Sequence, residues 1–218
     1  MKKYLFLLLT NLSVSFIGFS QLDWQWMKSG GGTTNTNNYD MVYGLTKDGS
    51  NNIYSCGTFH GTNVSIGSRT YTASNRTVFV TKKDIDGNPI WTYVPTCTGI
   101  SQAYNIAIDP SGNVIVCGQY SGSIMFSSTT LTAGAGTNSS YVCKLNGTTG
   151  SVIWAVALKS AGDATSDVSA VGLATHTDGT IYVCGSYKGT GLTFNMASSY
   201  GSTTNSSGVL QTDGFLDS

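Results

Sequence analysis

The chain has 218 residues, 40% of them hydrophobic and only 10% charged, so it can bury one sizeable core and is not expected to be disordered. Its eleven acidic residues are all Asp and balance eleven Lys and Arg residues, and without a basic run a nucleic-acid partner is not expected. The lack of Glu and the abundance of Gly, Ser, Thr and Asn oppose long helices and favour an all-β chain.

Residues 1–20 have the composition of an export signal. Lys2 and Lys3 precede a largely apolar stretch, and the small residues that flank Phe19 indicate cleavage after Ser20. Polar residues interrupt this stretch and no uniformly apolar run of about 18 residues follows it, so a membrane anchor is the less favoured alternative. We therefore expect a secreted or cell-surface protein, with no membrane span in the mature chain.

Four short strands are predicted in the first part of the mature chain, separated by turns rich in Gly and Asn. The first strand spans Met41 to Leu45, and the second ends in the motif Cys56-Gly57-Thr58-Phe59-His60-Gly61. After a polar excursion, a third strand spans Val78 to Lys82 and a fourth contains Trp91. We name these four strands A to D in chain order.

The same features recur twice, with a period of roughly 60 to 70 residues. The motif returns as Cys117-Gly118-Gln119-Tyr120-Ser121-Gly122 and as Cys184-Gly185-Ser186-Tyr187-Lys188-Gly189. A Trp marker recurs independently at Trp26, Trp91 and Trp154. A sheet of four short antiparallel strands cannot bury both of its faces alone, so successive units must stack, and radial stacking of such sheets is the β-propeller architecture.

This pattern resembles the SBBP-type repeats, a seven-bladed β-propeller family of secreted proteins from Bacteroidetes-like bacteria. The residues that carry the resemblance are the Asp, Gly or Asn turn, the Gly-x-aromatic-x-Gly end of strand B, the aromatic-Val-x-Lys strand C and the Trp of strand D. The resemblance covers Asp23 to Ser218. It implies an architecture and leaves the activity open, because propellers host many functions.

We therefore expect an all-β fold, a β-propeller of four-stranded antiparallel blades, with about three blades present in an incomplete ring. The units are placed at approximately residues 22–90, 91–153 and 154–218. The third unit stops before its strand D, which indicates a partial sequence with further blades or domains C-terminal to Ser218. Closure by association with other copies is the less favoured alternative.

The recurring residues are interpreted as structural. The Cys residues of the motif are expected to be buried core residues, since equivalent positions on sheets about 10 Å apart cannot form a disulfide. A disulfide between Cys117 and Cys143 is possible but not preferred. Glycines are expected at strand ends and Trp residues between blades. The structural set is Cys56, Gly57, Phe59, Gly61, Cys117, Gly118, Tyr120, Gly122, Cys184, Gly185, Tyr187, Gly189, Trp26, Trp91 and Trp154.

No catalytic residue, metal ligand or cofactor is predicted. His60 and His176 lack the neighbouring ligands of a zinc site, and Asp residues in separate hairpins do not form a calcium-binding loop. Ser186 is misplaced for a Gly-x-Ser-x-Gly nucleophile.

A binding surface is predicted where the B–C and D–A connections lie, because propeller topology places these long connections on one face. The B–C excursions span residues 61–77, 122–140 and 189–208, and polar loops on a rigid scaffold suit recognition. Solvated spacers that contain a small hairpin are an equally weighted alternative. The candidate binding residues are the aromatic ones, Tyr71, Phe126, Phe194 and Tyr200.

The favoured function is a secreted or cell-surface, non-catalytic module that binds a glycan or a protein through these loops. One alternative is a structural spacer in a longer surface protein whose activity lies beyond Ser218. The other is a propeller-type lyase or glycoside hydrolase, which would need paired acids.

Overall fold

The computed structural model describes residues 27, 30–31, 40–134, 138–160, 167–188, 192–195 and 214–216. Every pairing between its named strands is antiparallel. None of the described residues is helical. The expected all-β class is therefore confirmed.

The strands form three main sheets and one small sheet. Sheet I consists of β1 (Met41–Lys47), β2 (Ile53–Ile66), β3 (Arg69–Lys83) and β4 (Pro89–Tyr93) in that order. Sheet II has the order β14-β11-β10-β7-β6, from β6 (Ser101–Ile108), β7 (Val114–Tyr120), β10 (Ser139–Leu145), β11 (Val152–Ser160) and β14 (Leu192–Asn195). Sheet III contains β12 (Asp167–Thr175), β13 (Ile181–Lys188) and β15 (Gly214–Leu216), and the small sheet contains β5 (Thr96–Cys97), β8 (Ser123–Phe126) and β9 (Thr129–Thr132).

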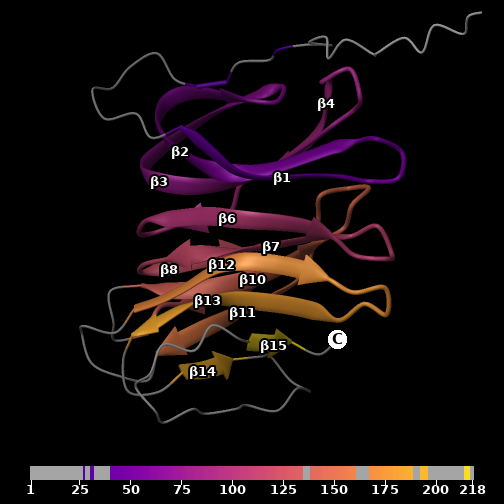
Figure 1. The fold of residues 1–218 in the computed structure, drawn as a ribbon. Helices are drawn as coiled ribbons and strands as arrows, with labels where there is room; N and C mark the ends of the chain where they lie inside the picture. The colour runs from indigo at the N-terminus through magenta and orange to yellow at the C-terminus, as the bar shows by residue number, and fades with distance from the viewer. Residues whose placement is uncertain are drawn as a thin grey trace, which may run out of the picture.

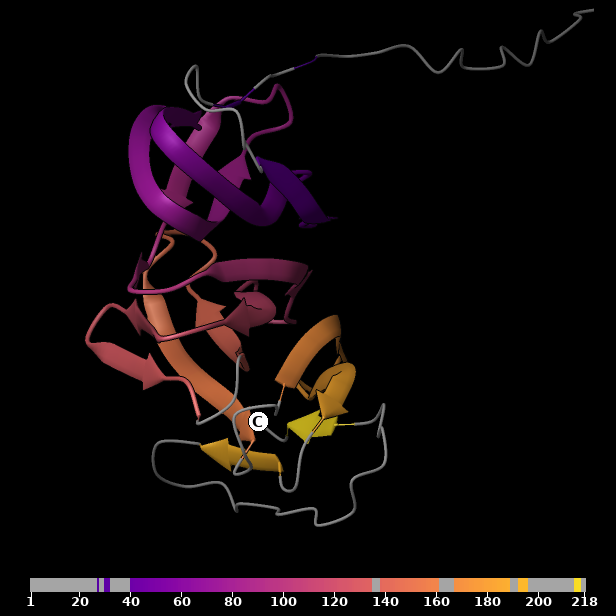
Figure 2. The same ribbon diagram turned by 90° about the vertical axis from the view of Figure 1, so that its left-hand side faces the viewer.

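The three main sheets follow one another along the molecule, with sheet II between sheets I and III (Figures 1 and 2). The strands of sheet I lie side by side in chain order, as A to D. Sheet II keeps that order for β6, β7, β10 and β11, and adds β14 at the edge beyond β11. Within the described residues these sheets do not close into a ring (Figure 2).

The sheets begin and end at different places from the predicted units. Trp91 pairs with Lys82 of β3, and Trp154 pairs with Lys144 of β10. Each Trp strand is therefore the last strand of its own sheet. The approximate unit boundaries at residues 91 and 154 fall between strand D and the strand C to which it is hydrogen-bonded.

Two cores fill the spaces between the main sheets, and alternation along the strands of sheet II supplies both of them. Val116, Tyr141 and Cys143 belong to the core shared with sheet I, which contributes Tyr54 and Val80. Neighbouring residues on the same strands, Ile115, Cys117 and Val142, belong to the core shared with sheet III. Successive side chains of a strand point to opposite faces, so the middle sheet is apolar on both sides.

A β-bulge recurs in the first strand of each main sheet. The register shifts between Val42 and Gly44, between Ala103 and Asn105, and between Ala170 and Gly172. Opposite each bulge lies the first glycine of the motif. A Cβ atom on Gly57, Gly118 or Gly185 would lie 1.9, 2.0 or 1.9 Å from a carbonyl oxygen of the neighbouring strand.

These three glycines therefore allow two strands to approach closely at a bulge. The expectation that they serve strand ends is wrong for them, because each lies inside a strand. The second glycine of the motif instead permits a positive φ. Gly61 lies inside β2 and has a φ of 120° where the register shifts, whereas Gly122 has a φ of 66° in the connection between β7 and β8.

Candidate functional site

The motif cysteines divide into two buried residues and one exposed residue. Cys56 and Cys117 are both 0% exposed. Cys56 lies in the core between sheets I and II, and Cys117 in the core between sheets II and III. Cys184 is exposed, because no further sheet of the described residues covers that face of sheet III. The expectation of a buried core residue is therefore correct at two positions and wrong at Cys184.

None of the five cysteines forms a disulfide. Cys117 pairs with Val142, and Cys143 pairs with Val116 on the same two strands. The two thiols therefore point to opposite faces of sheet II, where a bridge cannot form. Burial raises the pKa of both the Cys56 and the Cys117 thiol to about 12, so these groups are protonated and unreactive at neutral pH.

The two described Trp residues pack between sheets, as predicted. Trp91 on β4 donates a hydrogen bond from Nε1 to the carbonyl oxygen of Gly147 in sheet II, at 3.2 Å. Its ring contacts Tyr54 edge-on, with 6.0 Å between centroids. Trp154 packs against the core between sheets II and III. Trp26 lies outside the described residues.

The motif aromatics are core residues as well. Phe59, Tyr120 and Tyr187 are 1%, 1% and 7% exposed. Gly189, the last glycine of the third motif, lies outside the described residues.

A repeated ion pair, which the sequence analysis did not identify, ties each A–B turn to strand C in sheets I and II. Asp109 Oδ2 lies 2.8 Å from Lys144 Nζ, and Asp48 Oδ2 lies 3.8 Å from Lys82 Nζ. The sequence does contain a signal for this ion pair, because an Asp at the start of the A–B turn and a Lys in strand C recur together in both units. The third turn begins with His176 in place of Asp.

These carboxylates are held in the charged form. Burial raises the pKa of Asp109, but hydrogen bonds from Lys144 and Asn113 outweigh it and leave the pKa below its usual value. The pKa of Asp48 is lowered in the same way, because hydrogen bonds from Asn52, Tyr54 and Ser50 outweigh desolvation. The pairs stabilise turns and belong to the scaffold.

The B–C excursions of sheets I and II are hairpins. In sheet I, β2 and β3 continue beyond Phe59 and stay paired as far as Ile66 and Arg69. In the second excursion, β8 and β9 form a separate hairpin, and β8 pairs with β5 of the D–A connection. B–C and D–A connections therefore lie together at one end of the sheets, as predicted.

The four candidate binding aromatics differ in where they lie and in how deeply they are buried. Tyr71 is half-buried on β3 and packs against Phe59, with 6.0 Å between ring centroids. Phe126 is 2% exposed and contacts Tyr141 at 5.1 Å, so it is a core residue, and its candidacy for ligand contact is wrong. Only the backbone of Phe194, in β14, is described, and Tyr200 lies outside the described residues.

A groove of about 310 Å³ lies between the first excursion and the D–A connection. We call it the loop-face groove. Residues 71–75 and Thr77 line one side, residues 94–97 the other, and Phe59 also contributes to the lining. Its side chains are aromatic, aliphatic, hydroxyl, amide and thiol groups, and none of them carries a full charge at neutral pH.

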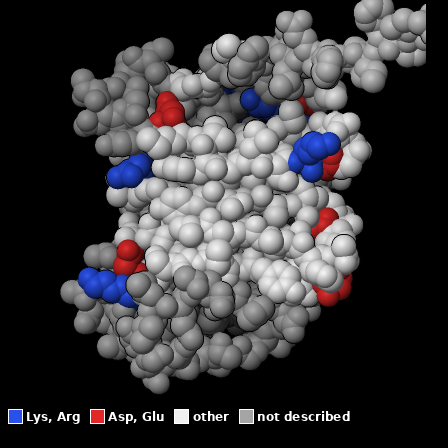
Figure 3. Space-filling view, viewed as in Figure 1, with Lys and Arg blue, Asp and Glu red and all other residues white. Residues whose placement is uncertain are grey.

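Charged side chains are also sparse on the surface shown in Figure 3. Most Lys, Arg and Asp side chains in that view lie toward its two margins or its top, and an uncharged surface lies between them over the main sheets. Within the described residues, no three His, Cys, Asp or Glu side chains gather as a metal site would require. The part of the chain that the structure describes contains no helix long and apolar enough to cross a membrane.

No protein-family model matches this sequence, and a comparison with curated proteins finds no significant relative.

Proposed function

We propose that this protein is an exported, non-catalytic binding module whose three main sheets are blades of an incomplete β-propeller of the SBBP type, and that it binds a neutral glycan in the loop-face groove. The observation that carries the proposal is the lining of that groove. A half-buried Tyr71 lies beside exposed Thr72, Ser74 and Asn75.

A neutral sugar matches this lining in chemistry. Its C–H face can pack on an aromatic ring, while its hydroxyl groups exchange hydrogen bonds with hydroxyl and amide side chains. The groove offers no full charge that a neutral ligand would leave unpaired, and unpaired buried charges are costly. The groove volume of about 310 Å³ lies within the range of small-ligand sites and is suited to one or two sugar rings.

The rigidity of the groove supports the same function. Tyr71 is held against Phe59, and strand pairing fixes Val64 opposite Tyr71 in the hairpin. His60 Nε2 lies 3.1 Å from the carbonyl oxygen of Ser74, which ties the excursion back to strand B. A groove built on paired strands loses little conformational entropy when it binds.

A glycan array probed with the full chain tests the proposal. We expect binding to neutral oligosaccharides, and Tyr71→Ala and Asn75→Ala should each weaken that binding by about tenfold, the usual effect of removing an aromatic or hydrogen-bonding contact. Tyr182→Ala is the matched control, since Tyr182 is 39% exposed on sheet III, away from the groove. Binding that survives both groove variants, or an array without neutral ligands, contradicts the proposal.

A further inference from the structure

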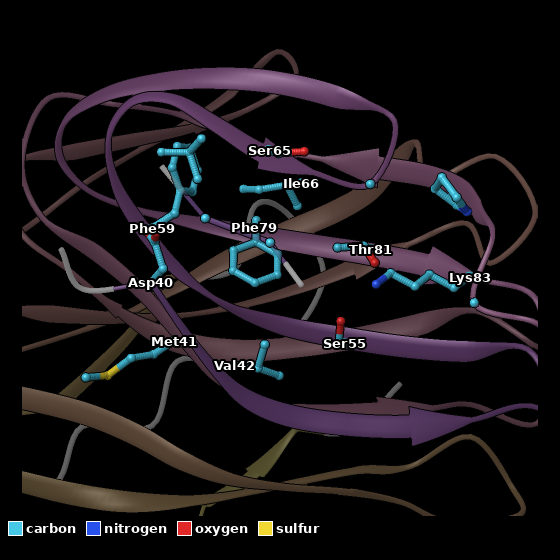
Figure 4. A pocket seen from close by; sticks show the side chains of 16 residues that line it. Asp40, Met41, Val42, Ser55, Phe59, Ser65, Ile66, Phe79, Thr81 and Lys83 are labelled. Atoms are coloured by element: carbon cyan, nitrogen blue, oxygen red, sulfur yellow. The ribbon is translucent and has the colours of Figure 1, made fainter. Parts of the chain in front are cut away.

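A second pocket, of about 320 Å³, opens on the face of sheet I that points away from sheet II (Figure 4). We call it the sheet I pocket. Phe59, Phe79, Ile66 and Pro89 give it an apolar lining. Ser55, Thr81 and Lys83 supply polar groups toward one end, and Asp40 lies toward the other (Figure 4).

The three polar residues at that end belong to one patch of the sheet. Ser55 of β2 and Thr81 of β3 are paired across the two strands, so their side chains are direct neighbours on one face. Lys83 follows Thr81 by two residues on the same strand and therefore shares that face. Figure 4 shows the Ser55 hydroxyl and the Lys83 side chain directed toward the same space.

Comparison with sheet II shows that this polar patch departs from the repeat. Cys56 pairs with Val80 as Cys117 pairs with Val142, so Ser55 is equivalent to Val116, Thr81 to Cys143 and Lys83 to Leu145. The three residues of sheet II are at most 1% exposed and pack against sheet I. Sheet I thus has two hydroxyl groups and an ammonium group where sheet II has an apolar docking face.

Thr81 adds an independent observation. Thr81 is only 2% exposed, and its buried Oγ1 has no hydrogen-bond partner among the described residues. An unsatisfied buried hydroxyl destabilises the folded state, whereas Cys143 at the equivalent position has no such group to satisfy. A ligand acceptor that enters from the pocket would satisfy it.

We propose that the sheet I pocket binds a small monocarboxylate with an apolar body. The carboxylate accepts hydrogen bonds from the Ser55 and Thr81 hydroxyls and pairs with the Lys83 ammonium, while the apolar body packs on Phe79 and Ile66. The Asp40 carboxylate, which accepts a hydrogen bond from the backbone N–H of His60 at 3.2 Å, lies toward the far end and disfavours a second negative charge there.

The test uses the full chain and phenylacetate as the probe, with isothermal titration calorimetry and saturation-transfer NMR as readouts. We expect phenylacetate to bind. Phenylacetamide should bind at least about tenfold more weakly because it lacks the negative charge that pairs with Lys83. Benzene-1,4-diacetate should also bind at least about tenfold more weakly, because its second carboxylate lies near Asp40. Inorganic phosphate should not compete. Equal binding of the amide, or displacement by phosphate, overturns the proposal.

Variants assign the binding to these residues. Lys83→Met should weaken phenylacetate binding by at least about tenfold. Thr81→Val should weaken it several-fold while leaving the thermal midpoint unchanged or raised, because the variant removes an unsatisfied hydroxyl. Lys159→Met, on sheet II and outside the pocket, is the matched control and should bind normally. Asn75→Ala, a loop-face groove variant whose side chain lines only that groove, should also bind phenylacetate normally, which separates the two sites.

Wild-type affinity in Lys83→Met and Thr81→Val overturns the proposal, and so does a wild-type chain that does not bind phenylacetate.

Discussion

The five cysteines differ in exposure, and their expected reactivity differs with it. Cys184 is exposed, whereas Cys56, Cys117 and Cys143 are 0 to 1% exposed. Burial raises the pKa of all three buried thiols, and the thiolate is the form that reacts. At pH 8, Ellman's reagent should therefore modify Cys184 within minutes, whereas the three buried thiols should react only after denaturation.

Mass spectrometry of the modified peptides checks the order of labelling. Denatured protein should release five thiols, because none of the cysteines is bridged. A native chain in which Cys117 reacts as fast as Cys184, or a denatured chain that lacks two thiols, contradicts the structure.

Asp109 is the best-buried carboxylate of the repeated ion pair, with a side chain only 4% exposed. Asp109→Asn removes the partner of Lys144 while it keeps a side-chain oxygen for the N–H of Asn113. We expect the free energy of unfolding at pH 7 to fall by about 2 kcal/mol, since Lys144 is left partly buried without its counter-charge. Asp178→Asn, in the equivalent turn of sheet III, is the control and should leave the urea unfolding midpoint unchanged, because both partners of that ion pair are exposed.

The same pair gives stability a defined pH dependence. The pKa of Asp109 is lower in the folded chain than its ordinary value of 3.8. The ionised Asp109 therefore contributes fully to the free energy of unfolding above about pH 4. That contribution is lost as the pH falls through the pKa that Asp109 has in the folded chain. Urea unfolding at pH 7 and pH 3 should show that wild type and Asp109→Asn differ less at pH 3. A difference of the same size at both pH values would exclude the ionised pair as its source.

At the scale of strands, the bulge explains why the motif contains glycine beside cysteine. A Cβ on Gly118 would lie 2.0 Å from the Gln102 carbonyl oxygen, so Gly118→Ala forces β6 and β7 apart. We expect a loss of about 3 kcal/mol or more in the free energy of unfolding. Gly49→Ala is the matched control, since a Cβ there meets no atom within 4 Å, and it should be neutral within about 0.5 kcal/mol. Similar unfolding midpoints for the two variants would refute the steric role.

The strands that the sequence analysis placed correctly are those with a strong local signal. Runs such as Val114-Ile115-Val116, closed by an Asp- and Gly-rich turn, mark paired strands, and Asp109 stabilises its turn by accepting hydrogen bonds from Asn113. The bulges could not be found in this way, because a register shift depends on the partner strand.

From the sequence, a hairpin in the excursions is expected only under the spacer alternative, because Ser, Thr and Asn carry little strand signal. One signal was available in the second excursion. Ile124, Phe126 and Leu131 are buried, and alternate with polar or exposed neighbours, which is the pattern of a hairpin with one buried face. The sequence placed the B–C and D–A connections together, but it could not distinguish Tyr71, which lines the groove between them, from Phe126, which fills the core.

At the scale of the whole molecule, each sheet is held by contacts with its neighbours. The carbonyl oxygen of Gly147 in sheet II accepts hydrogen bonds from Lys82 Nζ and Trp91 Nε1 of sheet I, at 2.9 and 3.2 Å. A second, separate core joins sheets II and III. Stability in such an array is approximately a sum of terms for each sheet and each interface, so damage at one interface should remain local.

Val183 tests this locality. It is 5% exposed on β13 and lies in the core between sheets II and III. Val183→Ala should destabilise that interface by about 2 kcal/mol and speed hydrogen exchange in β12 and β13, while β1 to β4 exchange at the wild-type rate. Val171→Ala is the matched control, since Val171 is 48% exposed on the same sheet and its truncation should leave exchange unchanged.

Hydrogen-exchange mass spectrometry resolves the sheets separately. Faster exchange in all three sheets would mean that they unfold as one cooperative unit, because loss of the second interface would then also release the contacts made at Gly147.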